Sequence, residues 1–510
     1  MPTSRRTVVR VYSWHFRLQQ TLACLFALIC SATVMASPTP KSIALEVLGD
    51  TPSYSIGPTG SKAEQAWWQE LKDPRLQQWI AQALNDNPSL QAAWERVRLA
   101  ESAAMQQGSA LLPSAQVSAG GYRNSTEGLL QQLAWQTGGS ISQEVIDYLG
   151  EQYQTAQWSL SATWGIDLFG RNTALWLASR WDKKAAEGSR VAQSMAVAHQ
   201  VAAAYYDWIA ASEVHRFIEK QVLAQSELMA LSRSSYEGGD ISSLDLHLQE
   251  QQLAASQAAL PASKNQVRAA KGRLATLLGK PISVLRNEEL QAESQLPDPP
   301  PFLGLGSPLS LLETRPDLLA ASAQVHAAHL RRISAWSNLF PQLALSASTG
   351  AAGQQIGADA DWQSAGTWSI GLSASLSLFS GGRNWATAKG ANAGYRAASF
   401  DLQNALLAAV RDVEDAWGTL DQLNKETAAL QRQVVAARSA YEESRSLYQS
   451  GVLPYLTLLT SEQVLQQAEI GLVTSRRNRL SAYIYLHDAL GSTWAIDASR
   501  KTPIDTPEKP

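Results

Sequence analysis

The sequence predicts a mainly α-helical fold, duplicated in tandem, that carries strands of the transmembrane β-barrel type. Three observations lead to this prediction: residues that recur about 210 to 228 positions apart, two stretches of alternating apolar residues, and two long proline-free stretches rich in helix formers. A period of that length is too long for a solenoid repeat and is typical of two copies of one large unit.

The duplication is visible residue by residue. At an offset of 228, Pro88, Val97 and Pro113 return as Pro316, Val325 and Pro341. The offset is 210 where Trp158, Leu168 and Phe169 return as Trp368, Leu378 and Phe379, and 212 where Tyr236 and Gly239 return as Tyr448 and Gly451. The first copy therefore carries about 18 extra residues, which the sequence places between Gly121 and Gln157.

Residues 1–36 have the pattern of an export signal. Arginines come first, an apolar run from Leu22 to Ile29 follows, and small residues precede Ser37. Both cysteines, Cys24 and Cys30, lie in this segment, and neither has the small residue before it together with the aliphatic residue three positions earlier that lipidation needs. No other segment has 18 consecutive apolar residues, so we expect no transmembrane helix in the mature chain.

Strict alternation marks the strands. Apolar residues of period two run from Trp158 to Leu168 and again from Trp368 to Leu378, with serine, threonine and glycine between them. Partner strands follow Pro113 and Pro341. A length of about 9 to 11 residues, a face of small polar residues and a tryptophan at one end favour membrane strands over a soluble sandwich. The membrane-facing candidates are Trp158, Leu160, Trp164, Ile166, Trp368, Ile370, Leu372 and Leu376.

Each copy then continues as a long helix and a shorter return helix. The first repeat spans 37–282, with a helix at 88–111, a strand pair at 114–169, a long helix at 171–238 and a return helix at 242–278. A proline-rich linker, 283–315, precedes the second repeat at 316–495, with a helix at 316–339, strands at 342–379 and helices at 383–450 and 455–490. The long helices correspond to roughly 100 Å, which the two shorter helices of each copy match when stacked end to end. A disordered tail is expected at 496–510.

The residues give no sign of catalysis. No Ser/His/Asp grouping, phosphate loop, CxxC or HExxH motif is present, so we expect neither an enzyme nor a cofactor. His326 and His329 have a spacing that places both on one helix face, but without a third ligand nearby a metal site is not expected. The formal charge of −3, without a basic stripe, argues against a nucleic-acid partner.

Four strands per chain cannot close a barrel, because the smallest membrane barrels have eight and an open sheet would leave backbone groups unpaired in lipid. Two chains would supply eight strands and three would supply twelve, and the strand count itself leaves both open.

The chain resembles the TolC family of outer-membrane channel proteins, in particular the branch that serves drug and metal efflux pumps. The matching stretches are Trp67-Trp68, Asp73 to Leu76, Leu168 to Arg171, Leu311 to Leu318, Leu378 to Arg383, Gly451 with Tyr455 to Leu459, and Ala489 to Gly491. The resemblance covers essentially the whole mature chain.

The resemblance implies a homotrimer with a 12-stranded barrel in the outer membrane and an α-helical barrel extending through the periplasm. Its implied partners are a periplasmic adaptor, an inner-membrane pump and outer-membrane lipid. It also implies that the turns between long and return helices dock the adaptor. The corresponding residues are Tyr236, Gly239, Ser243, Leu244, Tyr448, Gly451, Tyr455 and Leu456.

Acidic residues near the second turn are candidates for a periplasmic aperture. Glu442 and Glu443, with Arg445 nearby, would recur around a threefold axis, where an inward-facing carboxylate makes a ring that attracts cations. The alternative is that these side chains lie on a solvated outer face.

The leading functional hypothesis is a passive exit duct for small molecules in a tripartite efflux system. A second hypothesis is the exit duct of a type I polypeptide secretion system, which differs only in its inner-membrane partner. A third is a soluble periplasmic coiled-coil protein whose strands form a small sandwich.

Overall fold

The computed structural model describes residues 39–49, 53–57, 67–124, 153–239, 241–285, 296–302, 304–356 and 361–491. The export signal expected at 1–36 and the tail expected at 496–510 lie outside these ranges. So do most of the extra residues of the first copy, which fall at 125–152.

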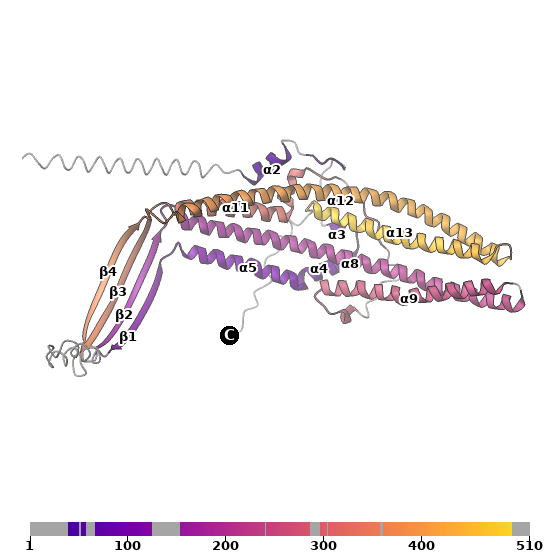
Figure 1. Ribbon diagram of the computed structural model, residues 1–510, viewed down its shortest axis with the longest axis horizontal. Helices are drawn as coiled ribbons and strands as arrows, with labels where there is room; N and C mark the ends of the chain where they lie inside the picture. Colours follow the sequence, from indigo (N-terminus) through magenta and orange to yellow (C-terminus); the bar gives the residue numbers. More distant parts are fainter. Residues whose placement is uncertain are drawn as a thin grey trace, which may run out of the picture. The chain divides into compact units, whose positions relative to one another are not determined.

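Helices dominate the described chain (Figure 1). The N-terminal helices are α2 (Pro40–Leu48), α3 (Trp67–Glu70), α4 (Pro74–Asp86) and α5 (Pro88–Ser109). The first long helix and its return helix are α8 (Arg171–Gly238) and α9 (Ser243–Leu277), followed by short turns η1 (Ile282–Leu285) and η2 (Pro308–Ser310). The second copy has α10 (Leu311–Thr314), α11 (Pro316–Ser337), α12 (Arg383–Gln449) and α13 (Tyr455–Ala489).

The two long helices are nearly equal, with 68 residues in α8 and 67 in α12. None of the described helices is apolar enough over a sufficient length to cross a membrane.

The chain divides into two compact units that do not follow the repeat. One unit contains residues 99–183 and 324–398, and the other contains residues 38–98, 184–323 and 399–510, each as far as described. Each unit therefore combines corresponding parts of both copies, which is what a side-by-side association of two repeats produces.

The first unit contains one antiparallel sheet in the order β1-β2-β3-β4. Its strands are β1 (Ser114–Asn124), β2 (Tyr153–Ile166), β3 (Gln342–Ile356) and β4 (Gln363–Ser375). β1, with 11 residues, has the length of 9 to 11 expected from the apolar alternation, whereas β2, β3 and β4, with 13 to 15 residues, are longer. For these three strands the expectation was wrong because the backbone ladder continues past the apolar stretch, pairing polar residues such as Thr155 and Gln354.

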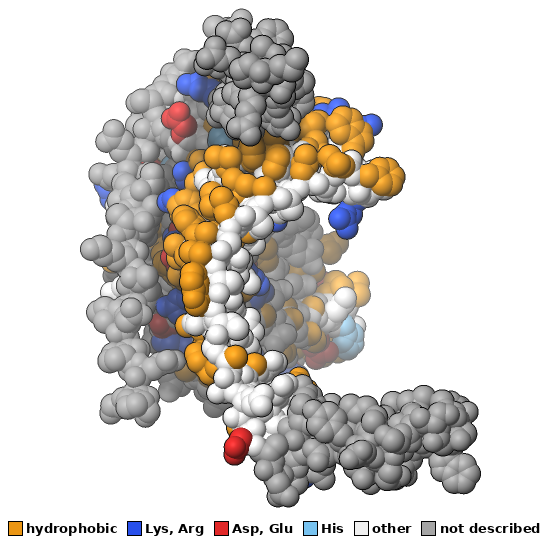
Figure 2. Space-filling view, turned by 90° about the vertical axis from the view of Figure 1, so that its left-hand side faces the viewer, with side chains coloured by type: hydrophobic (Ala, Val, Ile, Leu, Met, Phe, Trp, Pro, Cys, Tyr) orange, Lys and Arg blue, Asp and Glu red, His pale blue; other side chains and the backbone are white. Residues whose placement is uncertain are grey.

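The sheet has one apolar and one polar face. In register, Leu160 lies between Val117 and Thr349, and Trp164 lies opposite Leu345. The other face carries hydroxyl pairs, with Oγ–Oγ distances of 2.8 Å for Ser118–Ser159 and 2.9 Å for Ser348–Ser369. Figure 2 shows the hydrophobic side chains gathered along one side of a strip of backbone and polar atoms.

The two hairpins differ in register from the sequence repeat. Trp158 lies opposite Ala119, so the offsets of 210 and 228 would place Trp368 opposite Ala347. Ile370 lies opposite Ala347 instead, and Trp368 lies opposite Thr349, two residues nearer the loop end of the sheet. The faces are kept, because a two-residue shift preserves the side-chain alternation.

The second unit has a continuous core rich in aromatic side chains. Tyr206 and Trp208 of α8 are fully buried with Leu76 and Ile80 of α4, and Tyr483 of α13 joins the same cluster. The helix α4 begins at Pro74 behind Asp73, whose carboxylate accepts bonds from the backbone N–H groups of Arg75 and Leu76. This cap and the buried face fix the N-terminal segment onto the helices.

The short helices meet at two equivalent joints in this unit. At the first, the Asn87 side-chain amide donates to the carbonyl of Leu277, at 2.7 Å, so the start of α5 is tied to the end of α9. At the second, the Thr314 hydroxyl donates to the carbonyl of Leu490, at 3.0 Å, beside the start of α11. Each bond satisfies a helix-terminal carbonyl that has no partner within its helix.

Candidate functional site

The turns at the ends of the long helices are built around glycine. Gly239 and Gly451 have φ of +83° and +74°, a left-handed conformation that disfavours any side chain with a Cβ. Their N–H groups donate to the carbonyls of Tyr236 and Tyr448, both at 3.0 Å. Because no atom lies within 4 Å of a Cβ placed on either glycine, backbone conformation and not lack of room requires glycine here.

The two turns are otherwise unlike. Tyr455 is only 2% exposed, and its ring lies 5.8 Å from that of Tyr448. It belongs to a cluster with Leu458 that packs against Leu228 of α8 and Leu248 of α9. The equivalent residue of the first copy, Ser243, is exposed. The second turn therefore holds the two hairpins together.

Four of the predicted docking residues have exposed side chains, and we call them the tip surface. They are Tyr236, Ser243, Leu244 and Leu456. Leu244 is 65% exposed and Leu456 is 59% exposed, which leaves apolar area at the turns open to a partner. Tyr448 is half-buried and Tyr455 is buried, so these two belong to the packed cluster and not to the tip surface.

The aperture candidates lie roughly two helical turns before Gly451. Glu442, Glu443 and Arg445 all have exposed side chains in the single chain. Arg445 also lines a hollow of about 210 Å³ between α8, α12 and α13, together with Tyr441, Gln225 and Glu462.

Glu462 is an acidic residue that the sequence reasoning missed. It is only 8% exposed, and its carboxylate accepts a hydrogen bond from the side-chain amide of Gln225, which is also buried. Burial raises the pKa of Glu462, against the opposing effects of Gln225, Gln221 and Arg445. The sequence did contain a sign of this burial. Glu462 has the helical spacing of one buried face with Tyr455, Leu458 and Leu459.

The predicted membrane-facing residues occupy one face of the sheet, except Leu376, which follows the last residue of β4, and most are exposed in the single chain. Trp158, Leu160 and Trp164 of β2 share this face with Leu372 of β4, which is 67% exposed. Trp368, Ile370 and Leu376 are exposed as well, whereas Ile166 is half-buried. An apolar face that no other described part of the chain covers is typical of contact with lipid.

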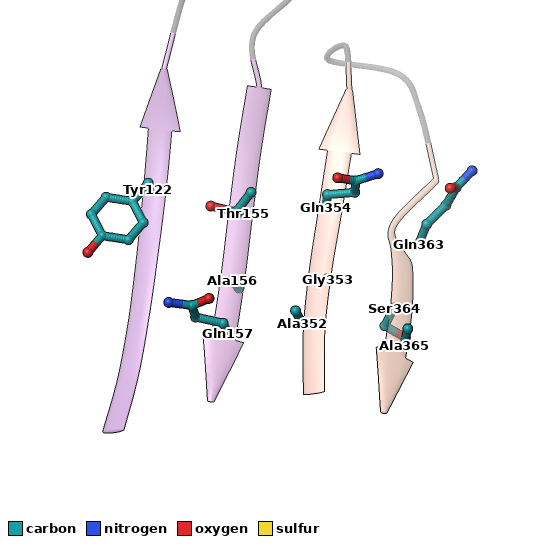
Figure 3. Close-up of a pocket in the computed structure, with 10 residues that line it drawn as sticks. All are labelled: Tyr122, Thr155, Ala156, Gln157, Ala352, Gly353, Gln354, Gln363, Ser364 and Ala365. Carbon is teal, nitrogen blue, oxygen red and sulfur yellow. The ribbon is translucent and has the colours of Figure 1, made fainter. Parts of the chain in front are cut away.

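The polar face is hollowed toward the loop end (Figure 3). One register row across the four strands, Tyr122, Thr155, Gln354 and Gln363, lines a hollow of about 750 Å³. Within β1–β4 the single charged residue is Arg123, whose neighbours in register are Gln154 and, beyond it, Gln355. By alternation these three belong to the apolar face. The polar face thus offers hydrogen-bonding groups without charge.

The two histidines form ring contacts. His326 stacks on Trp181 with ring centroids 4.3 Å apart, and His329 lies edge-on to Tyr395 at 5.6 Å. Burial lowers the pKa of His329, with the charges of Arg332 and His326 acting in the same direction. No group of three metal-ligating side chains occurs among the residues that the structure describes.

A sheet with one apolar and one uncharged polar face, joined to two hairpins of very long helices, defines an outer-membrane channel protein. Residues 79–280 and 308–492 match the family model described as outer membrane efflux protein. The chain belongs to this family.

Relatives and solved structures agree with this assignment. The pyoverdine export outer membrane protein OpmQ of Pseudomonas aeruginosa is 27% identical over 475 residues, which cover 93% of this chain and 96% of the relative. The toluene efflux pump outer membrane protein TtgC of Pseudomonas putida is 26% identical, covering 90% and 92%.

The outer-membrane channel OprN has a TM-score of 0.71 at 24% identity, covering 87% of this chain and 99% of that one. The CmeC outer membrane channel of Campylobacter jejuni has a TM-score of 0.74 at 19% identity, covering 86% and 90%. These two likenesses show the fold.

The predicted fold class and function are confirmed: the chain is an outer-membrane efflux channel protein with a transmembrane β-barrel part and a periplasmic α-helical tunnel. The family is one of passive channels and not of enzymes.

Proposed function

We propose that three copies of this chain form a passive exit duct, in which a 12-stranded barrel continues into a helical tunnel. The observation that carries the proposal is the four-stranded sheet, in which β1 and β4 each pair on one side only among the described strands. A membrane cannot hold such open edges, because unpaired backbone groups are costly in lipid. Pairing β4 of one copy with β1 of the next removes both edges.

The duct carries small molecules that an inner-membrane pump delivers through a periplasmic adaptor. Support for small molecules comes from the relatives, whose names refer to export of pyoverdine and of toluene. The polar face of the sheet fits this role, since it carries no charged side chain among the described strand residues. The chain performs no chemistry of its own and holds no cofactor.

The adaptor docks on the tip surface. Exposed leucines beside a glycine turn offer apolar area with a polar rim, which is the usual composition of a protein-binding patch. Buried Tyr455 and its neighbours keep the two turns in a fixed arrangement, so that the patch is preorganised.

Photo-crosslinking in intact cells tests this proposal. A benzoylphenylalanine at Leu244 or at Leu456 should capture a periplasmic adaptor encoded near a pump. The matched control is Leu223, an equally exposed leucine of α8 about four turns before Gly239. Capture from Leu223 alone, or from neither tip position, would contradict docking at the tips. Native mass spectrometry of the purified protein tests the trimer independently.

A further inference from the structure

In the first unit, the two sequence repeats of one chain contact each other. The residues equivalent to those in this contact lie at the two outer edges of the sheet and make no such contact within the chain. The two repeats meet beside the end of β2 and the start of β3. The ring of Phe169, after β2, stacks on that of Phe340, before β3, with centroids 5.0 Å apart and planes 19° from parallel. The hydroxyl of Ser337 on α11 lies 3.0 Å from the carbonyl of Phe169 and, equally, 3.0 Å from that of Ile333 in its own helix, and shares its hydrogen between them. We call this contact the internal seam.

Each residue of the internal seam has an equivalent elsewhere in the chain. At the offset of 210, Phe169 corresponds to Phe379, which follows β4. At the offset of 228, Phe340 and Ser337 correspond to Leu112 and Ser109, which precede β1. The counterparts thus lie at the two opposite edges of the sheet and cannot meet within one chain.

Both counterparts are uncovered in the single chain. Phe379 is 89% exposed, whereas Phe169, in the internal seam, is 36% exposed. Leu112 is 66% exposed, and Ser109 is exposed where Ser337 is buried. The hydroxyl of Ser109 donates to the carbonyl of Gln106 in its own helix, at 2.7 Å.

We infer that Phe379 of one chain packs against Leu112 of a second chain, with the hydroxyl of Ser109 of that second chain at the carbonyl of Phe379. This inference rests on the proposed trimer and names residues at the interface between its chains. The contact is head-to-tail, since it joins β4 of one copy to β1 of the next, and such contacts close into a ring when the rotation permits. The antiparallel alternation of the four strands makes β4 and β1 of the next copy antiparallel as well.

The helices beside the two seams, α11 with α8 and α5 with α12, differ in the side chains that they present to each other. Beside the internal seam, Arg331 of α11 forms an ion pair with Asp182 of α8. Their equivalents are Ala103 of α5 and Gly394 of α12, both exposed. Gly394 belongs to a row of exposed small residues on α12 that also contains Ala386, Gly390, Ala393 and Ala397. No atom lies within 4 Å of a Cβ placed on Gly390 or Gly394.

The small residues of α12, together with Ala103 of α5, permit the backbones of α12 and of α5 from the next copy to approach closely at this point. Beside the seam between copies the helices therefore pack closely, where an exposed ion pair lies beside the internal seam.

Cysteine crosslinking in the full chain tests the inference, with Cys24 and Cys30, the sequence's two cysteines, replaced by serine. The double variant Leu112→Cys, Phe379→Cys, treated with a short bismaleimide, should give covalent products of two and three chains on a denaturing gel. The internal pair Phe169→Cys, Phe340→Cys should crosslink within one chain and leave the mass unchanged. The mismatched pair Leu112→Cys, Phe169→Cys should give no product of higher mass.

Native mass spectrometry of each variant separates the outcomes. A trimer that gives no product from the Leu112 and Phe379 pair overturns the inferred seam and leaves the proposed duct standing. Covalent product with a native mass of two chains supports the seam and overturns the trimer. As a second readout, benzoylphenylalanine at Leu112 should crosslink to a peptide containing Phe379, and capture of a peptide from another segment overturns the seam.

Discussion

Gln225 of α8 donates a hydrogen bond to the buried carboxylate of Glu462 on α13, which links the two helical hairpins near the tip surface. The phenol of Tyr441 and the guanidinium of Arg445 line the same hollow. A buried acid held mainly by amides is poised to take up a proton, because burial disfavours its charged form.

Replacing this acid by its neutral isostere should stabilise the tip at neutral pH. Since burial raises the pKa of Glu462 above its ordinary value, the folded state binds the proton more tightly than the unfolded state. The resulting stabilisation is fully present below the ordinary glutamate pKa and is lost as the pH rises through the raised value. Glu462→Gln should remove this dependence and increase amide-exchange protection of α13 about fivefold at pH 8, or about 1 kcal/mol.

Hydrogen–deuterium exchange of peptides from α8 and α13 at pH 5 and pH 8 measures this effect. Glu443→Gln is the matched control, because that side chain is exposed on the neighbouring helix. Equal pH dependence in the wild-type protein and in Glu462→Gln would contradict the assignment.

Charge reversal at the aperture candidates should change cation block of the channel. In the proposed trimer, an inward-facing carboxylate at Glu442 or Glu443 recurs three times around the axis, and Lys replaces three negative charges by three positive ones. Glu442→Lys and Glu443→Lys channels in planar bilayers, with divalent or hexammine cations added from the periplasmic side, measure the effect. We expect at least one variant to lose block, and the hypothesis fails if both block as the wild type does.

A single acid on the polar face of the sheet should create ion selectivity. Gln354 lines the hollow near the loop end of this face, whereas the next residue, Gln355, belongs to the opposite face by strand alternation. Gln354→Asp should shift the reversal potential in a salt gradient toward cation preference, with Gln355→Asp as its matched control. An equal shift in both variants would mean that the polar face does not line the conduction path.

A charge on the apolar face should impair membrane assembly. Leu372 belongs to this face and Ser373 to the polar one. Leu372→Arg should cost about 2–4 kcal/mol of folding stability in lipid, the range for a basic side chain near the bilayer midplane. Ser373→Arg should fold with little change. Urea titrations of folding into vesicles give both values, and a larger loss for Ser373→Arg would reverse the assignment of the faces.

Local sequence patterns were sufficient for much of this fold, because the features they report depend on near neighbours. Alternation from Trp158 and from Trp368 indicated strands and their apolar side, since period two is a property of the strand itself. The absence of proline between Gly170 and Gly239 indicated one uninterrupted helix, which the structure has at Arg171–Gly238. The glycine turns were visible because a left-handed residue favours glycine wherever it occurs.

What the sequence determined by itself was the fold class, the duplication and the polarity of each face, because each is written in the spacing of residues along one element. Tertiary structure decided how the elements are matched. Trp158 and Trp368 are equivalent in the sequence repeat, yet their positions in the two hairpins differ by two residues. Trp158 lies opposite Ala119, whereas Trp368 lies opposite Thr349 and not opposite Ala347, the equivalent of Ala119. Glu462 is an ordinary acid in the sequence and becomes buried only because α8 packs across α13. Register and burial depend on contacts between distant segments, and no local pattern contains them.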